Sequence, residues 1–216
     1  MTTDPFRTPE RAALAATVRA FTTDHIAPHV DEWEANGEMP LSLQKEAASL
    51  GLLGVGFPEE VGGSGGDAVD MTIIIEGILA GGGTGGVVAG MLTHGIATPH
   101  VSDEVLRRRE SGDEAGATYL QDRFVRPILA GEVVASLGVT EPDGGSDVAR
   151  LRTTAARDGD SVVLNGAKTY ITSATRADHV VVAARTGGEG AEGISLIAVP
   201  TDTAGFSITR KLDKMG

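Results

Sequence analysis

The sequence contains no cysteine, which excludes disulfide bonds, thiol nucleophiles and thiolate metal sites. Aromatic residues make up only 4% of the 216 residues, so a core must be built mainly from aliphatic side chains and alanine. Basic residues are scarce too, because 18 lysines and arginines stand against 30 aspartates and glutamates, for a formal charge of −12. This charge repels a phosphate backbone, and we therefore expect no nucleic-acid partner.

Long apolar runs are also missing. The most apolar stretches, Val180–Ala184 and Ile194–Val199, have the length of strands and are far too short to span a membrane. The first residues lack the basic start and the apolar stretch of a secretory signal peptide. We therefore expect a cytoplasmic protein that does not associate with a membrane.

Few residues are available as metal ligands. Among the five histidines only His25 and His29 have the spacing of one helical turn, and Pro28 between them disturbs the helix that would align them. No glutamate follows His25, so the pattern of zinc-dependent proteases is absent. We expect no bound metal.

The first part of the chain has the apolar spacing of helices. Thr8 followed by Pro9 is a favourable start, because threonine caps a helix and proline suits its first turn. Leu14, Val18 and Phe21 then recur at four- and three-residue intervals. We predict further helices over Leu41–Gly51, Ala68–Ala80, Val87–Ile96 and Tyr119–Leu129.

After Gly131 the apolar period changes to that of strands. Asp158-Gly159 and Asn165-Gly166 are typical of tight turns between such strands. The fold class we predict is α+β, with an N-terminal all-α domain over residues 1–131 and a small antiparallel β-barrel or sandwich domain over residues 132–216. The expected strands are Val133–Thr140, Leu151–Arg157, Ser161–Leu164, Thr169–Thr172, His179–Ala184, Ile194–Val199 and Phe206–Thr209.

A glycine-rich stretch, Gly81–Gly86, fits the pattern G-x-G-x-x-G of dinucleotide-binding sites. Such a site needs a strand before the glycines and a helix after them, within a parallel βαβ unit. Here the preceding residues have helical spacing. We therefore predict a connection between two helices.

Two sequence blocks carry a specific resemblance. Leu137–Asp147 reads LGVTEPDGGSD, and Val163–Thr172 reads VLNGAKTYIT. Together they resemble the T-E-P-x-x-G-S-D and L-N-G-x-K-x-(W/Y)-I-T blocks of the acyl-CoA dehydrogenase family. Phe57–Gly63 resembles the P-E-x-x-G-G loop of that family, and Arg210–Gly216 resembles the segment that leaves its middle domain. The order and spacing of these blocks make the resemblance specific over nearly the whole chain.

The residues of these blocks suit a flavin on their own chemistry. Strand alternation predicts that Gly138 and Thr140 face one side, where a flat ring can approach closely. On a second strand Tyr170 and Thr172 would share a face toward the same ring. The loop Asp143–Ser146 has little steric bulk and exposes backbone N–H groups, which suits a pyrophosphate or a pantetheine amide.

The resemblance implies an FAD-dependent flavoprotein oxidoreductase of fatty acid metabolism that catalyses the α,β-dehydrogenation of an acyl-CoA thioester. It also implies an electron-transfer flavoprotein as acceptor and a homo-oligomer or hetero-oligomer. Ser146 would touch the thioester arm of the substrate, and the Thr172 hydroxyl would lie near flavin N5. The residues implied to contact FAD are Leu137, Gly138, Val139, Thr140, Gly145, Ser146, Tyr170, Ile171 and Thr172.

The catalytic base is not assigned to any residue of this chain. The resemblance implies a carboxylate in a C-terminal helical bundle, which would lie beyond Gly216, and we therefore expect this chain alone to be inactive. Glu141 is a poor candidate, because it precedes Pro142 in a turn and leaves the flavin-facing strand. Ser102–Thr118 is longer and more charged than the family usually has, and we expect a surface extension there.

Three alternatives stay open at this point. The chain could be a short non-catalytic subunit that pairs with a partner chain. It could also belong to a flavin oxidase or monooxygenase on the same scaffold, or be an interaction module without a cofactor. The class of acyl chain cannot be inferred from these residues.

Overall fold

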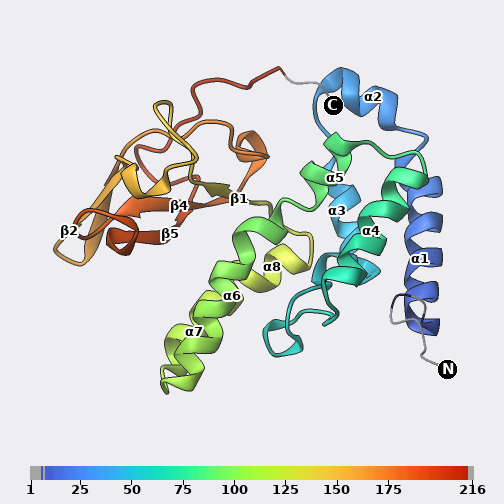
Figure 1. The fold of residues 1–216 in the computed structure, drawn as a ribbon, viewed down its shortest axis with the longest axis horizontal. Helices are drawn as coiled ribbons and strands as arrows, with labels where there is room; N and C mark the ends of the chain where they lie inside the picture. The colour runs from blue at the N-terminus through green and yellow to red at the C-terminus, as the bar shows by residue number, and fades with distance from the viewer. Residues whose placement is uncertain (1–5, 7, 214–216) are drawn as a thin grey trace. The chain divides into compact units, whose positions relative to one another are not determined.

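The computed structural model describes Phe6 and residues 8–213, which form two compact units. One unit contains the described residues up to Val133 together with Asp213, and the other spans Val134–Leu212. The first is helical, and within the described residues no helix is long and apolar enough to cross a membrane. Its elements are α1 (Pro9–Phe21), η1 (Thr22–Ile26), α2 (Val30–Asn36), α3 (Leu41–Ser49), η2 (Leu52–Gly54), η3 (Glu59–Val61), α4 (Ala68–Ala80), α5 (Gly85–Met91), α6 (His94–Glu110), α7 (Glu114–Leu120), η4 (Gln121–Val125) and α8 (Arg126–Leu129) (Figure 1).

The helix starts follow the predicted chemistry. The Thr8 hydroxyl accepts a hydrogen bond from the N–H of Arg11, and Pro9 occupies the first turn of α1. The glycine-rich stretch joins α4 to α5, which confirms a helix–helix connection in place of a dinucleotide site. The helix predicted over Val87–Ile96 is wrong in extent, because α5 ends at Met91 and α6 begins at His94.

Helices α1 and α4 cross closely in the core of the helical unit (Figure 1). A Cβ atom on Gly77 would lie 2.6 Å from Val18 Cγ1, and one on Gly81 would lie 2.6 Å from Thr22 Cγ2. The two glycines, one turn apart, therefore allow two helices to approach more closely than any other residue would. The fully buried core around this crossing contains Val18, Ile26, Leu43, Leu52, Leu53, Ile74, Ile78 and Met91.

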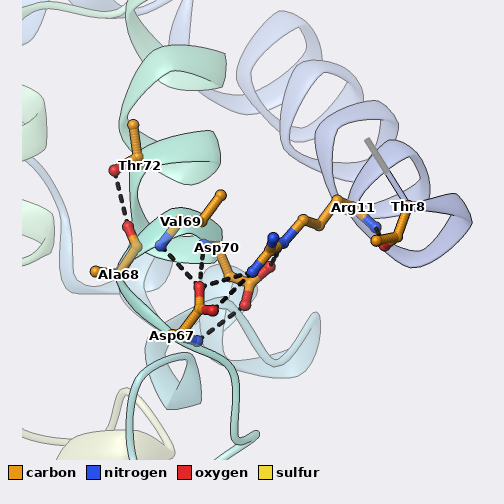
Figure 2. Close-up of polar contacts among 7 residues, drawn as sticks. All are labelled: Thr8, Arg11, Asp67, Ala68, Val69, Asp70 and Thr72. Atoms are coloured by element: carbon orange, nitrogen blue, oxygen red, sulfur yellow. Dashed lines mark hydrogen bonds and ion pairs between the residues drawn. The ribbon is translucent and has the colours of Figure 1, made fainter. Parts of the chain in front are cut away.

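A salt-bridge network joins the first turns of these two helices (Figure 2). Asp67 caps α4 by accepting hydrogen bonds from the N–H groups of Val69 and Asp70, and the Asp70 carboxylate accepts one from the Asp67 N–H. Arg11 donates to both carboxylates at 2.8 Å. The pKa of Asp70 is lowered, mainly by the hydrogen bond from Arg11 to its carboxylate and next by the bond from the Asp67 N–H.

The second unit is built on one mixed sheet. Its strands are β1 (Ala135–Gly138), β2 (Thr154–Asp158), β3 (Ser161–Asn165), β4 (His179–Arg185) and β5 (Ile194–Pro200). Strand β4 pairs antiparallel with β5, and β2 and β3 form an antiparallel hairpin. Strand β1 runs parallel to β4, and β2 meets β4 in parallel through Thr154 and Arg185. Around β4 the core contains Val134, Ala177 and Val180.

The α+β class is confirmed, but the predicted antiparallel barrel or sandwich is wrong. Strands β1 and β4 are joined by the long connection 139–178, which carries the hairpin β2–β3 and gives the chain room to return in parallel. Within the described residues the sheet is open, with the order β1-β4-β2-β3 and β5 on β4.

Two of the predicted strands are not strands. Residues 169–172 form no regular ladder, because Tyr170 has a φ of 58° and Ser173 a φ of 61°, which an extended strand cannot accommodate. Phe206–Thr209 is also irregular, although Phe206 packs against the core of this unit. Apolar alternation over four residues was too short a pattern to distinguish a strand from an ordered loop.

Candidate functional site

The two segments predicted to meet at a flavin lie side by side. The Thr169 N–H donates to the Thr140 carbonyl at 2.9 Å, and the Ser136 hydroxyl donates to the Thr172 carbonyl at 2.7 Å. Residues 168–172 therefore run antiparallel to residues 136–140, as an irregular segment rather than as a strand. Tyr170 is 66% exposed, and its positive φ removes the alternation that would have placed it on one face with Thr172.

Solvent exposure does not separate the two sides of β1 clearly, because Ala135 is buried like Ser136 and Thr140 is half-buried like Val139. Ser136 and Gly138 are buried, whereas Leu137 and Val139 are half-buried. A Cβ atom on Gly138 would lie 3.2 Å from Val180 Cγ1 and 3.5 Å from Lys168 Cγ. The small size of Gly138 therefore serves packing within the unit. Leu137 and Val139, on either side of Gly138 in the chain, are partly accessible to solvent.

The loop after β1 is a tight turn. The N–H of Glu141 donates to the Gly144 carbonyl at 2.9 Å, and the N–H of Gly144 donates back at 3.1 Å. Gly145 then packs under Thr140, since a Cβ atom there would lie 3.1 Å from Thr140 Cγ2. Ser146 follows as an exposed residue. The turn thus brings Gly145 and Ser146 back beside the end of the β1 segment.

Several backbone donors around this turn have no acceptor in the protein. Over residues 8–213, no atom accepts a hydrogen bond from the N–H groups of Thr140, Gly145, Ser146 or Thr172. Backbone N–H groups are normally paired with protein, water or a ligand. These four are available to acceptor atoms of a bound molecule, and they come from the two adjacent segments and the loop between them.

The nearly buried carboxylate of Glu141 links three segments of the site by hydrogen bonds. Glu141 Oε1 accepts hydrogen bonds from the Thr153 N–H at 2.8 Å, the Thr153 hydroxyl at 2.5 Å and Lys168 Nζ at 2.9 Å. Glu141 Oε2 accepts one from the Arg152 N–H at 2.7 Å. Glu141 therefore joins the β1 loop to residues 152–153 and to residue 168.

The hydrogen bonds also fix the charge of Glu141. Burial acts to raise its pKa, but the bonds from the Thr153 hydroxyl, the Arg152 N–H and Lys168 outweigh burial and lower the pKa to about 2. The side chain is 10% exposed. Glu141 is therefore ionised at neutral pH and its oxygens are occupied, which makes it unsuitable as a catalytic base.

A hollow of about 270 Å³ is lined by residues of this loop and of the segment after it, with both apolar and charged side chains. Two exposed ion pairs border it, Arg152 with Asp143 at 3.0 Å and Arg150 with Asp147 at 3.2 Å. The described residues contain no group of three or more histidine, aspartate or glutamate side chains that could hold a metal ion.

The charged region Ser102–Thr118 forms the end of α6, a turn and most of α7. Val105 and Ala117 are fully buried, so the two helices pack as a hairpin. Arg109 donates to the Glu60 carbonyl at 2.9 Å and to the side chain of Gln121. The expected surface extension is therefore an ordered helical hairpin that contacts the loop containing Glu60.

Sequence reasoning missed Thr153 and Lys168 as members of the site. Both bind Glu141, and Lys168 also donates to the Val139 carbonyl at 3.0 Å. A signal was present, because Lys168 is the only charged residue of the second block and Glu141, one of three acidic residues of the first block, directly follows its apolar segment. Two such charges in adjacent segments are expected to pair when buried.

Comparison with known proteins gives consistent results. The family described as acyl-CoA dehydrogenase, N-terminal domain, matches residues 8–108, and acyl-CoA dehydrogenase, middle domain, matches residues 136–216. A probable acyl-CoA dehydrogenase of Bacillus subtilis (strain 168) is 37% identical over 212 residues, which are 97% of this chain and 52% of that protein.

Solved structures agree with these matches. A probable acyl-CoA dehydrogenase from Mycobacterium abscessus has a TM-score of 0.88 and 53% identity, over 98% of this chain and 53% of that one. A glutaryl-CoA dehydrogenase from Mycobacterium smegmatis, solved in complex with FADH2, has a TM-score of 0.74 and 31% identity, over 98% of this chain and 51% of that one. The chain thus spans about half the length of the relatives it matches.

Proposed function

This chain belongs to the acyl-CoA dehydrogenase family, and on that premise we propose that it forms the helical and flavin-binding parts of an FAD-dependent acyl-CoA dehydrogenase. In this proposal residues 1–131 form the helical domain and residues 132–216 the flavin-facing domain. When bound, FAD supplies the acceptor for the hydride that leaves the β-carbon of an acyl-CoA thioester. An electron-transfer flavoprotein is the proposed electron acceptor, and a cytoplasmic oligomer the proposed state.

The observation that carries this proposal is the set of unpaired N–H donors beside a half-buried aliphatic side. Thr140 and Thr172 lie on the two adjacent segments, and their N–H groups are available to the polar edge of a flavin. Leu137 and Val139 offer an apolar side suited to its ring. Gly138, Tyr170 and Ile171 are also proposed to form the flavin site. Gly138 would contribute through its small size, which lets the Lys168 side chain pack close to β1.

We propose that the loop after β1 binds the phosphate and thioester parts of the ligands. The N–H groups of Gly145 and Ser146 are unpaired in the described part of the chain, and a nest of such donors suits a pyrophosphate or an amide carbonyl. Ser146 is exposed, so its hydroxyl is accessible to an acyl-CoA arm. These residues bind and orient, and they take no part in proton transfer.

The base that removes the α-proton is proposed to come from outside the described residues. Each of the three carboxylates in the loop after β1 is already ion-paired: Glu141 with Lys168, Asp143 with Arg152, and Asp147 with Arg150. Glu141 in addition has a pKa of about 2. A general base needs a pKa much nearer the working pH and a free oxygen.

Flavin binding and anaerobic reduction test this proposal. The intact protein should bind FAD and, when mixed with a panel of acyl-CoA thioesters without oxygen, lose the visible absorption of oxidised flavin. Failure to bind FAD would contradict the proposal. Rapid reoxidation of the reduced flavin by O2 would favour a flavin oxidase or monooxygenase instead.

A pair of threonine variants provides the matched control. Thr172→Val removes a hydroxyl at the proposed flavin site and should weaken FAD binding or slow flavin reduction. Thr175→Val makes the same change at an exposed position nearby in the chain and should leave both unchanged. Equal behaviour of the two variants would argue against a flavin contact at Thr172.

A further inference from the structure

Lys168 and Glu141 form a nearly buried ion pair behind the two segments that we propose to bind flavin. Lys168 Nζ lies 2.9 Å from Glu141 Oε1, and the two side chains are 11% and 10% exposed. The removal of two charges from water is expensive, so a buried ion pair is weak evidence for a purely stabilising role. The role of the pair is therefore to be found in the backbone groups that Lys168 and Glu141 also bind.

The second bond of Lys168 acts on the backbone of the site. Its Nζ donates to the Val139 carbonyl at 3.0 Å, and the next residue, Thr169, donates its N–H to the Thr140 carbonyl at 2.9 Å. Two successive carbonyls are thus held from the same segment. The orientation of the peptide unit between Val139 and Thr140 is fixed by this arrangement.

The same peptide unit carries a free donor on its other side. Because a trans peptide is planar, its C=O and N–H point in opposite directions, so the Thr140 N–H points away from the Lys168 ammonium. That N–H donates to no atom of residues 8–213. The ammonium on the carbonyl end polarises the peptide and strengthens the donor at the N–H end.

Glu141 fixes the ammonium in turn. Its carboxylate accepts from the Arg152 N–H, the Thr153 N–H and the Thr153 hydroxyl as well as from Lys168. With these four donors the carboxylate has little freedom to move. Lys168 consequently has one place for its charge, between the carboxylate and the Val139 carbonyl.

We infer that Lys168 is a positioning residue that holds the Val139–Thr140 peptide so that its polarised N–H stabilises the extra negative charge of a reduced flavin. Glu141 is the counter-ion that keeps Lys168 in place. The inference rests on the proposed function, because it requires a flavin next to Thr140. It concerns the redox poise of that flavin, which preorganised dipoles and charges tune.

The midpoint potential of the flavin in the intact protein tests this inference. Lys168→Met should still bind oxidised FAD but bind the reduced form about tenfold more weakly, which lowers a two-electron potential by about 30 mV. Lys168→Arg keeps a charged donor and should restore most of the potential. Lys45→Met removes the same charge from an exposed position on α3 and should leave the potential unchanged.

One further variant and a melting measurement separate this effect from a folding defect. Lys168→Gln keeps a neutral donor for the Val139 carbonyl, and thermal melting of the flavin-free protein reports whether each variant is folded. If Lys168→Met does not fold, the folded Gln and Arg variants decide, and a lower potential in Gln alone supports the inference. Equal midpoint potentials in folded, flavin-loaded variants would overturn this inference and leave the proposed function intact. Failure of the unsubstituted protein to bind FAD would overturn both.

Discussion

The hydroxyl of Ser136 donates a 2.7 Å hydrogen bond to the carbonyl of Thr172, and this bond ties β1 to the irregular segment that runs beside it. Ser136 is fully buried, so its hydroxyl has no access to water as an alternative partner. The residue before the first sequence block is therefore joined to the end of the second block by a side-chain hydrogen bond rather than by a regular strand ladder.

Loss of this contact should destabilise the sheet unit. Ser136→Ala removes the donor of a part-buried hydrogen bond, and the net contribution of such a bond is about 0.5–1.5 kcal/mol. Urea unfolding should show a loss in that range, together with weaker FAD binding because the 168–172 segment is released. Ser161→Ala, at an exposed position on β3, should change neither quantity. An unaffected Ser136→Ala would show that the contact does not hold the segment.

The Glu141 carboxylate should make stability depend on acid. Its pKa is lowered from 4.5 to about 2, so the folded state binds fewer protons than the unfolded state between those values. The stabilisation is present above about pH 4.5 and is lost as the pH falls toward 2. A shift of this size corresponds to on the order of 3 kcal/mol at neutral pH. Glu141→Gln should therefore lose about that much at pH 7, and the difference from the unsubstituted protein should shrink on acidification.

Glu104 provides the matched control for this effect. Hydrogen bonds from Arg107 first, and then from Arg108, overcome burial and lower its pKa to about 2 as well, but its side chain is 32% exposed. Solvent screening reduces such surface pairs to about 0–1 kcal/mol. Urea unfolding of Glu104→Gln at pH 7 should therefore show at most that loss. A loss as large as that of Glu141→Gln would mean that burial does not distinguish the two carboxylates.

The loop Phe57–Gly63 should tolerate no side chain at its last glycine. A Cβ atom on Gly63 would lie 2.1 Å from the Phe57 carbonyl oxygen, which is backbone and cannot turn aside. Gly63→Ala should destabilise the helical unit by about 1–3 kcal/mol, as overpacking does elsewhere. Gly85→Ala, in the first turn of α5 with open space around it, should be neutral or slightly stabilising. Thermal melting of both variants checks the contrast.

Tyr170 should show strain that is retained for binding. Its φ of 58° is unfavourable for a side chain of this size, and glycine at such a position relieves about 1 kcal/mol. Tyr170→Gly should lose little stability but weaken FAD binding. Ser173→Gly, at a φ of 61°, should gain stability without a change in FAD affinity. If both variants bind FAD like the unsubstituted protein, Tyr170 is not a flavin contact.

Much of the fold could be predicted from local chemistry. The Thr8-Pro9 start, the helix over Ala68–Ala80 and the β2–β3 hairpin at Asp158-Gly159 depend on neighbours in sequence. The parallel pairing of β1 with β4 could not be predicted, because it depends on where a long connection brings the chain back. The positive φ of Tyr170 could not be predicted either, since it runs against the conformational preference of a bulky residue.

The adjacency of the two sequence blocks could be predicted, but the way in which their side chains pack against each other could not. Strand alternation indicated correctly that one side of β1 is small and polar, but Ser136 and Gly138 use that side to pack against residues 168–172. Leu137 and Val139 were named as FAD contacts by the family resemblance, whereas strand alternation pointed to Gly138 and Thr140; the structure leaves Leu137 and Val139 half-buried. Alternation separates two faces of a strand, but it does not tell which of them a neighbouring segment will cover.

The most direct test of the account is the FAD dissociation constant of Leu137→Asp. A carboxylate on the half-buried side of β1 would oppose an apolar ring there, and we predict FAD binding weakened by at least about tenfold, since each tenfold step needs only 1.4 kcal/mol. Leu196→Asp, at an exposed position on β5, serves as the control and should bind FAD normally. A folded Leu137→Asp variant that binds FAD as tightly as the unsubstituted protein would contradict the central claim that this side of β1 faces the flavin.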